Sequence, residues 1–149
     1  MNLINNKPAE MIKKIKHDPG KYLNYLLIVI SLHSALIGIN LIVLPAECFT
    51  YLNYNELNEP FYAYQGGVFH IVMAAGYYLA ALARHERKIF LLFIIIVKFC
   101  ATVFLLIYFA FEKQIIIVLF SGLTDFIMGL AVLYFYRLIN DVEKTDNIS

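Results

Sequence analysis

Four ionisable residues stand alone within long apolar stretches of this sequence. Each lies near the middle of a stretch of about 20 residues that is otherwise almost free of charge; they are His33, His70, Lys98 and Asp125. A charged side chain at the centre of a bilayer costs roughly 2.5–3.5 kcal/mol on insertion scales. Such residues therefore pair with one another inside a helix bundle, or serve a ligand, an ion or a proton. These four side chains are the candidates for chemistry.

The apolar stretches themselves predict membrane-spanning helices. The chain has 149 residues, of which 61% are hydrophobic and 15% are charged, whereas a typical soluble domain has roughly 25% charged residues. About 20 apolar residues cross the hydrocarbon core at the α-helical rise. We predict spans at residues 22–44, 61–83, 89–111 and 115–135. Because lipid leaves no partner for free backbone groups and four strands cannot close a barrel, the predicted fold class is all-α, a four-helix transmembrane bundle.

Connection lengths and basic residues predict the path of the chain. The turns at 84–88 and 112–114 are short enough to make the helices that they join antiparallel neighbours, so we expect an up-down-up-down bundle. Residues 1–21 contain five lysines and the 84–88 turn contains three basic residues, whereas the 45–60 loop contains no lysine or arginine. The positive-inside rule then makes both termini cytoplasmic. We expect a multi-pass protein of the cell (inner) membrane.

The flanking segments differ in composition from the spans. Residues 1–21 place apolar side chains on one helical face and lysines on the other, which predicts a basic amphipathic arm on the cytoplasmic leaflet. A disordered basic tail is the alternative. Residues 22–138 are predicted to form the transmembrane domain, and residues 139–149 a polar cytoplasmic tail.

The four central ionisable residues are predicted to lie at one depth and to meet. Counting from the centres of their spans places all of them within roughly 3 Å of the midplane. Lys98 and Asp125 lie at similar distances from the 112–114 turn, so we predict an ion pair between them. This pair can simply fix the register of two helices. Alternatively, Asp125 can help to bind a ligand or relay a proton beside the histidines.

Helical spacing adds further polar side chains to the candidate site. His33 aligns with Asn40 two turns later, and Lys98 aligns with Thr102 one turn later. The residues predicted to bind a ligand are therefore polar and lie on the inward faces of all four predicted helices: His33, Asn40, His70, Lys98, Thr102 and Asp125.

Cofactor and metal chemistry were considered from the same residues. Two histidines at one depth could ligate a haem axially, which would use His33 and His70. Zinc fits less well, because Asp125 and Cys100 would be the only further ligands at that depth, so no metal site is predicted. The chain shows no catalytic signature. No basic stripe lies outside the amino-terminal arm, and this absence argues against a nucleic-acid partner.

Short glycine-containing motifs recur along the spans. They are Gly38-Ile39-Asn40 before Pro45, Gly66-Gly67 with Gly76, and Ser121-Gly122 before Asp125 and Gly129. This layout, over most of residues 22–138, resembles the DoxX-like superfamily of small four-span membrane proteins. The resemblance implies quinone-linked redox steps or accessory roles in membrane oxidoreductase systems. DoxX-type proteins commonly carry a glutamate before the second-span glycines, where this chain has Gln65, so no catalytic residue is carried over.

These observations predict a small integral membrane protein with a buried polar site that binds a quinone, a lipid or another small molecule. Two alternatives remain open. One is a non-catalytic scaffold or accessory subunit whose polar residues fix helix register, and the other is a b-type haem protein. The expected partners are the lipid bilayer and either another membrane protein or a second copy of the chain.

Overall fold

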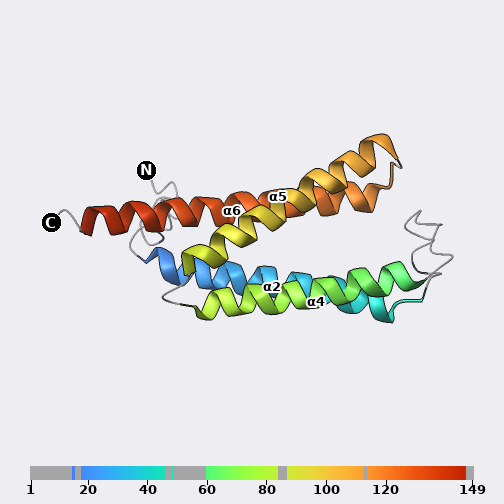
Figure 1. The fold of residues 1–149 in the computed structure, drawn as a ribbon, viewed down its shortest axis with the longest axis horizontal. Helices are drawn as coiled ribbons and strands as arrows, with labels where there is room; N and C mark the ends of the chain where they lie inside the picture. The colour runs from blue at the N-terminus through green and yellow to red at the C-terminus, as the bar shows by residue number, and fades with distance from the viewer. Residues whose placement is uncertain are drawn as a thin grey trace, which may run out of the picture.

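The computed structural model describes residue 15, residues 18–45, residue 48, and residues 60–83, 87–112 and 114–146. Within these residues the chain forms four α-helices and no strand (Figure 1). The helices are α2 (Pro19–Val43), α4 (Pro60–Leu82), α5 (Arg87–Phe111) and α6 (Ile116–Asp146). All four are long and apolar enough to cross a membrane. For this part of the chain, the prediction of an all-α protein with four membrane-length helices is confirmed.

The first helix begins earlier than the predicted span. Asp18 caps α2 by accepting a hydrogen bond from the backbone N–H of Lys21 at 3.1 Å, and Pro19 occupies the first turn. A capping aspartate followed by proline is a strong start signal, because proline has no N–H to satisfy there. The predicted boundary between arm and span, at residues 21 and 22, therefore lies inside α2. The rest of the predicted amphipathic arm lies outside the described residues, apart from Ile15.

The last helix continues beyond the predicted span. The predicted span ends at residue 135, before Arg137, but α6 runs to Asp146. A basic residue marks where a helix leaves the bilayer, whereas ending the helix itself requires glycine, proline or a capping arrangement. Residues 137–146 contain neither glycine nor proline. Most of the segment predicted as a polar tail is therefore helical.

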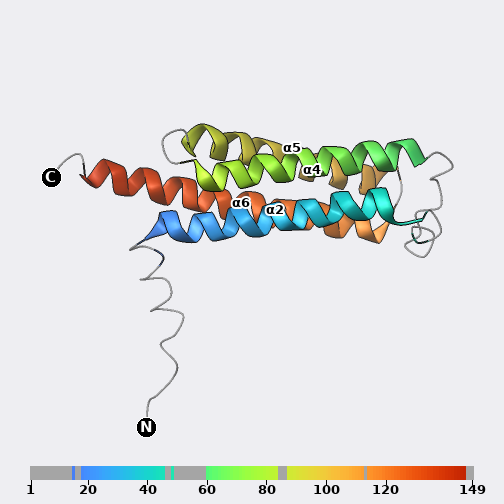
Figure 2. The same cartoon turned by 90° about the horizontal axis from the view of Figure 1, so that it is seen from below.

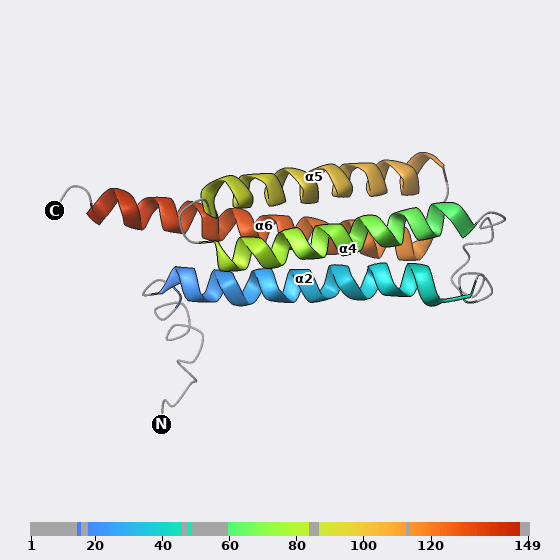
Figure 3. The same ribbon diagram turned by 60° about the horizontal axis from the view of Figure 1, so that its bottom comes forward.

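The helices associate as two closely packed pairs. One pair is α2 with α4, and the other is α5 with α6, while contacts between the pairs are sparser (Figure 1). In the views of Figures 2 and 3 the α2–α4 pair lies in front of the α5–α6 pair. In the first pair the backbones meet at Gly38 and Gly67, where a Cβ added to Gly38 would lie 2.7 Å from the carbonyl oxygen of Gly67. In the second pair, Gly129 lies against Lys98, whose Cβ would be 3.2 Å from an added methyl carbon. Small residues at these points allow the close approach.

All four helices pack together at only one end of the bundle. The core joins the first half of α2, the last half of α4, the first half of α5 and the region around Val132 of α6. Leu27, Ala80 and Leu91 are almost completely buried there. Arg87 also lies at this end, where it donates from Nη2 to the side chain of Asn24 at 2.8 Å and from Nε to the backbone carbonyl of Ala83, the residue after α4, at 3.0 Å. We call this region the closed end.

Toward the opposite end the two pairs move apart (Figure 1). Large apolar side chains on all four helices are more than half exposed there; examples are Leu36, Val68, Phe104 and Phe120. The buried glycines of this region, such as Gly38 and Gly122, are covered by the other helix of their own pair. We call this region the open end. The candidate site lies between the two ends.

Candidate functional site

An ion pair links the two helices of the second pair. Nζ of Lys98 on α5 lies 2.5 Å from Oδ1 of Asp125 on α6. The two side chains are 5% and 15% exposed, so both are largely shielded from the surroundings of the bundle. Neither charge could be held at this depth without its partner, because an unpaired charge in a low-dielectric interior is strongly unfavourable. The structure thus contains the predicted Lys98–Asp125 contact.

The first pair of helices holds a neutral polar contact at the same level. The hydroxyl of Ser34 on α2 donates to the backbone carbonyl of His70 on α4 at 3.0 Å, and its oxygen lies 3.3 Å from Nδ1 of the same histidine. Since the hydroxyl hydrogen is used by the carbonyl, this arrangement has Nδ1–H as the second donor. One turn earlier, the hydroxyl of Ser31 donates to the carbonyl of Ala74 at 2.8 Å. These bonds attach α2 to α4 and orient the His70 ring.

Tyr77 connects the two pairs. Its ring on α4 lies below the ammonium group of Lys98, with 5.2 Å between Nζ and the ring centroid. This distance is within the range of a cation–π interaction. The hydrogen bonds of Ser31 and Ser34 and the Lys98–Asp125 ion pair each stay within one helix pair, whereas the contact between Lys98 and Tyr77 crosses the seam at this level.

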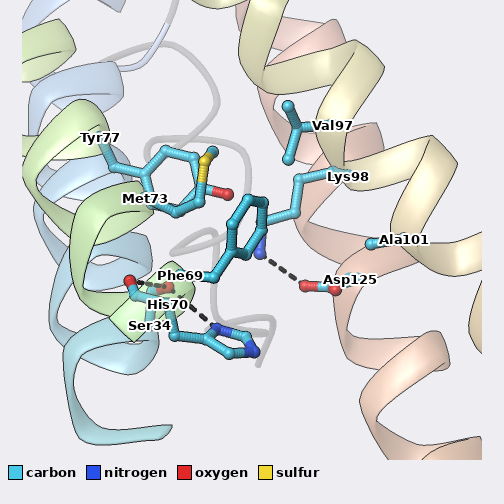
Figure 4. A pocket seen from close by; sticks show the side chains of 9 residues that line it. All are labelled: Ser34, Phe69, His70, Met73, Tyr77, Val97, Lys98, Ala101 and Asp125. Atoms are coloured by element: carbon cyan, nitrogen blue, oxygen red, sulfur yellow. Dashed lines mark hydrogen bonds and ion pairs between the residues drawn. The ribbon is translucent and has the colours of Figure 1, made fainter. Parts of the chain in front are cut away.

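A small cavity lies between the two pairs at this point (Figure 4). Its volume is about 40 Å³. Its polar lining comes from both pairs and consists of Ser34, His70, Tyr77, Lys98 and Asp125, while Phe69, Met73, Val97 and Ala101 complete the wall. Since one water molecule needs roughly 15 Å³ by this kind of measure, the cavity has room for about two or three.

The other predicted site residues lie apart from this cavity. His33 on α2 is half-buried and lies within electrostatic reach of both Lys98 and Asp125, but it does not line the cavity. Asn40 is exposed on α2. Thr102 is buried and donates to the carbonyl of Lys98 at 2.8 Å, with the Gly122 carbonyl 3.4 Å away, so it supports the contact between α5 and α6. Of the six predicted residues, the structure gathers His70, Lys98 and Asp125 around one cavity.

This arrangement does not fit an axial haem ligand pair. Axial haem ligation needs the two histidines on opposite sides of one large space. In the structure His70 lines a small cavity, and His33 does not line it. Among the residues that the structure describes, no three His, Cys, Asp or Glu side chains come close enough to hold a metal ion.

Two polar residues of the cavity, Ser34 and Tyr77, were not among the predicted ligand-binding set. Ser34 carries little signal of its own, because serine is common in transmembrane helices, but Ser31, Ser34 and Gly38 recur at helical spacing and form a stripe of small residues. Tyr77 follows His70 by two turns and so shares its face. Following these two stripes from Gly38 and His70 would have found both residues.

The chain was also compared with known proteins. No protein-family model, no curated protein and no solved structure matches it.

Proposed function

We propose that this protein binds a small lipid-soluble molecule, of the quinone or lipid class, at the seam between the α2–α4 pair and the α5–α6 pair. The polar end of the molecule would meet His70, Lys98 and Asp125 at the cavity. Its apolar part would lie between the pairs toward the open end, where the apolar side chains are exposed.

One observation carries this proposal: four of the five polar side chains around the cavity, all except Tyr77, are bonded within their own helix pairs. Ser34 bonds to His70 in one pair, and Lys98 bonds to Asp125 in the other. Separating the pairs slightly would therefore break no hydrogen bond among these four side chains and would weaken only the contact between Lys98 and Tyr77. A seam of this kind can admit a ligand without leaving buried polar groups unsatisfied.

The size of the cavity indicates how a ligand would be held. At about 40 Å³ it is far smaller than the usual ligand pocket of roughly 300–1,000 Å³. Only a small polar end can occupy it as it stands. The remainder of a larger molecule would have to lie outside the cavity, along the seam.

The orientation in the membrane is part of the same proposal. The basic residues of the amino-terminal arm and of the 84–88 turn support cytoplasmic termini and an up-down-up-down bundle in the inner membrane. The open end would then face the outer leaflet. The resemblance to DoxX-like proteins is compatible with a quinone as ligand.

The test is the retention of ligand during purification. Lipids and quinones are extracted from purified wild-type protein, from His70→Ala and from Asp125→Ala, and quantified by mass spectrometry per mole of protein. We expect a bound species in the wild type that falls severalfold in both variants. Ser121→Ala is the matched control, because its hydroxyl bonds only to a carbonyl of its own helix. Equal retention by all four proteins would contradict the proposal.

A second candidate function is supported by the position of the ion pair. Lys98 and Asp125 join two helices of the same pair, as expected of a contact that only fixes register. The protein would then be a scaffold or accessory subunit for another membrane protein or for a second copy of itself. In that case the double variant with Lys98→Met and Asp125→Leu supports the function of the partner protein in cells as well as the wild type does. Either single change reduces that function. For the ligand-binding proposal, the double variant also loses the ligand.

A further inference from the structure

The hydroxyl of Tyr77 is one of the polar groups of the cavity that lack a hydrogen-bond partner among the residues that the structure describes. Tyr77 is only 2% exposed, yet no residue in the described part of the chain forms a hydrogen bond with its hydroxyl. In Figure 4 this hydroxyl points away from α4 toward Lys98 on α5. Among the described residues no fully buried polar side-chain atom lacks a partner, so the unbonded Tyr77 oxygen keeps some accessible surface, and Tyr77 lines the cavity. A polar group in the cavity could therefore complete its hydrogen bond.

The second oxygen of Asp125 provides the complementary group. Oδ1 is engaged by Lys98, whereas Oδ2 has no hydrogen-bond donor among the described residues. Lys98 also has two further N–H groups, since an ammonium group carries three. The lining of the cavity therefore presents donors from Tyr77 and Lys98 and a free acceptor from Asp125.

The charges of the lining determine what kind of head group can enter. Its single positive side chain, Lys98, is bonded to its single acidic side chain, Asp125. An ionised ligand would therefore bring an uncompensated charge into a buried site, which is strongly unfavourable. Competition by a ligand for either partner would also leave the other one unpaired.

From these groups we infer that the cavity binds the hydroxyl of a neutral lipid alcohol. A hydroxyl can accept a hydrogen bond from Tyr77 or Lys98 and can donate one to Oδ2 of Asp125, and it fits a volume of about 40 Å³. A carbonyl oxygen can only accept, so it would leave Asp125 unsatisfied. The inference rests on the proposed function and narrows its ligand class to long-chain or isoprenoid alcohols and to quinols rather than quinones.

The experiment measures binding of three matched lipids to the full chain in nanodiscs. The probes are radiolabelled hexadecanol, 2-heptadecanone and palmitate at a pH where the acid is ionised, and empty nanodiscs provide the background. We expect hexadecanol to bind most tightly, the ketone more weakly, and palmitate roughly tenfold or more weaker than the alcohol.

Tyr77→Phe tests the hydroxyl directly. The ring remains over Lys98, but one hydrogen bond is lost, so hexadecanol affinity should fall about threefold to tenfold while ketone affinity falls less. Tyr78→Phe is the matched control, because Tyr78 is the next residue, is 50% exposed and does not line the cavity. Size-exclusion profiles and thermal unfolding midpoints confirm that both variants are folded.

The outcomes separate the inference from the proposed function. If no probe binds above empty nanodiscs, both are overturned. If the ketone or palmitate binds as tightly as hexadecanol, or if Tyr77→Phe behaves like Tyr78→Phe, a ligand site exists but the assignment of a lipid alcohol is wrong.

Discussion

The closed end and the open end of this bundle are built from similar residues but are held together differently. At the closed end, Leu27 on α2, Ala80 on α4 and Leu91 on α5 pack in one core shared by the helix pairs. Outward-facing side chains are exposed at both ends, as Leu36 (62%) and Leu82 (61%) show, but none of the described residues of the open end belongs to that core. Each pair is closely packed at the open end, but the pairs do not share a core there.

This difference explains where the polar residues lie. Lys98 and Asp125 could not be placed where the pairs diverge, because their charges would then face lipid. Placed wholly within the closed core, they would have no space for a ligand or for water. The structure has them at the transition, where the two side chains are still only 5% and 15% exposed and a cavity of about 40 Å³ remains.

The largest expected effect comes from breaking the ion pair at this transition. Lys98→Met or Asp125→Leu alone leaves one buried charge unpaired, which should lower the free energy of unfolding by about 3–5 kcal/mol. The double variant should recover most of that loss. Denaturant unfolding in mixed micelles, followed by circular dichroism, measures all three. If the single variants are as stable as the wild type, the pair is not buried as described.

A leucine truncation compares the two ends directly. Leu27 at the closed end is fully buried, so Leu27→Ala should cost about 2–5 kcal/mol by leaving a cavity. Leu36 at the open end is 62% exposed, and Leu36→Ala should change stability by no more than about 0.5 kcal/mol. The same unfolding measurement applies. Similar losses for both variants would mean that Leu36 is packed against the bundle rather than exposed as described.

The glycine contact tests whether α2 and α4 form a tight pair at the open end. A Cβ on Gly67 would lie 2.6 Å from Cγ1 of Ile42 and 2.8 Å from the backbone oxygen of Gly38, so Gly67→Ala should cost about 1–3 kcal/mol. Gly76 on the same helix has no atom within 4 Å of an added Cβ. Gly76→Ala should therefore be neutral or slightly stabilising. A neutral Gly67→Ala would indicate a looser pair.

The smallest effect is expected at Ser34. Ser34→Ala removes the hydroxyl that bonds to His70 and should cost about 0.6 kcal/mol, which is the average for interhelical hydrogen bonds in membranes. Ser121→Ala removes a hydroxyl that bonds only to its own helix and should change stability less. Cys100 is exposed and does not line the cavity, so it offers a labelling position for a fluorescence readout of both variants. Equal stability of the two variants would assign no role to the Ser34 bond in holding α2 to α4.

Much of the fold follows from the sequence because few backbone structures are stable in lipid. Apolar stretches of this length must form helices, and the four helices found begin within three residues of the predicted starts. The Lys98–Asp125 contact also follows, since counting from a short turn fixes the level of both residues. The end of α6 does not, because positive-inside counting locates the membrane surface and not the end of a helix.

The candidate site was less predictable than the fold. Counting residues gives the depth of a side chain in the membrane but not the side of the bundle toward which its helix turns it. His33 and Ser34 are adjacent in sequence, yet they lie about 100° apart around the helix axis. Ser34 faces α4, whereas His33 does not line the cavity. The pairing of helices through Gly38 and Gly67 decides which side of α2 faces inward, and that choice depends on contacts with α4 that the sequence of α2 alone does not contain.

The length of α6 has a mechanical consequence. The helix continues without interruption from Asp125, at the cavity, to Asp146, a distance of roughly 30 Å at the α-helical rise. Val132 lies between them in the core of the closed end, so α6 can pivot at this residue. A small tilt of α6 that widens the seam near Asp125 would move the Asp146 end of the helix in the opposite direction. Binding of a ligand at the cavity would then change the position of the carboxyl end of α6.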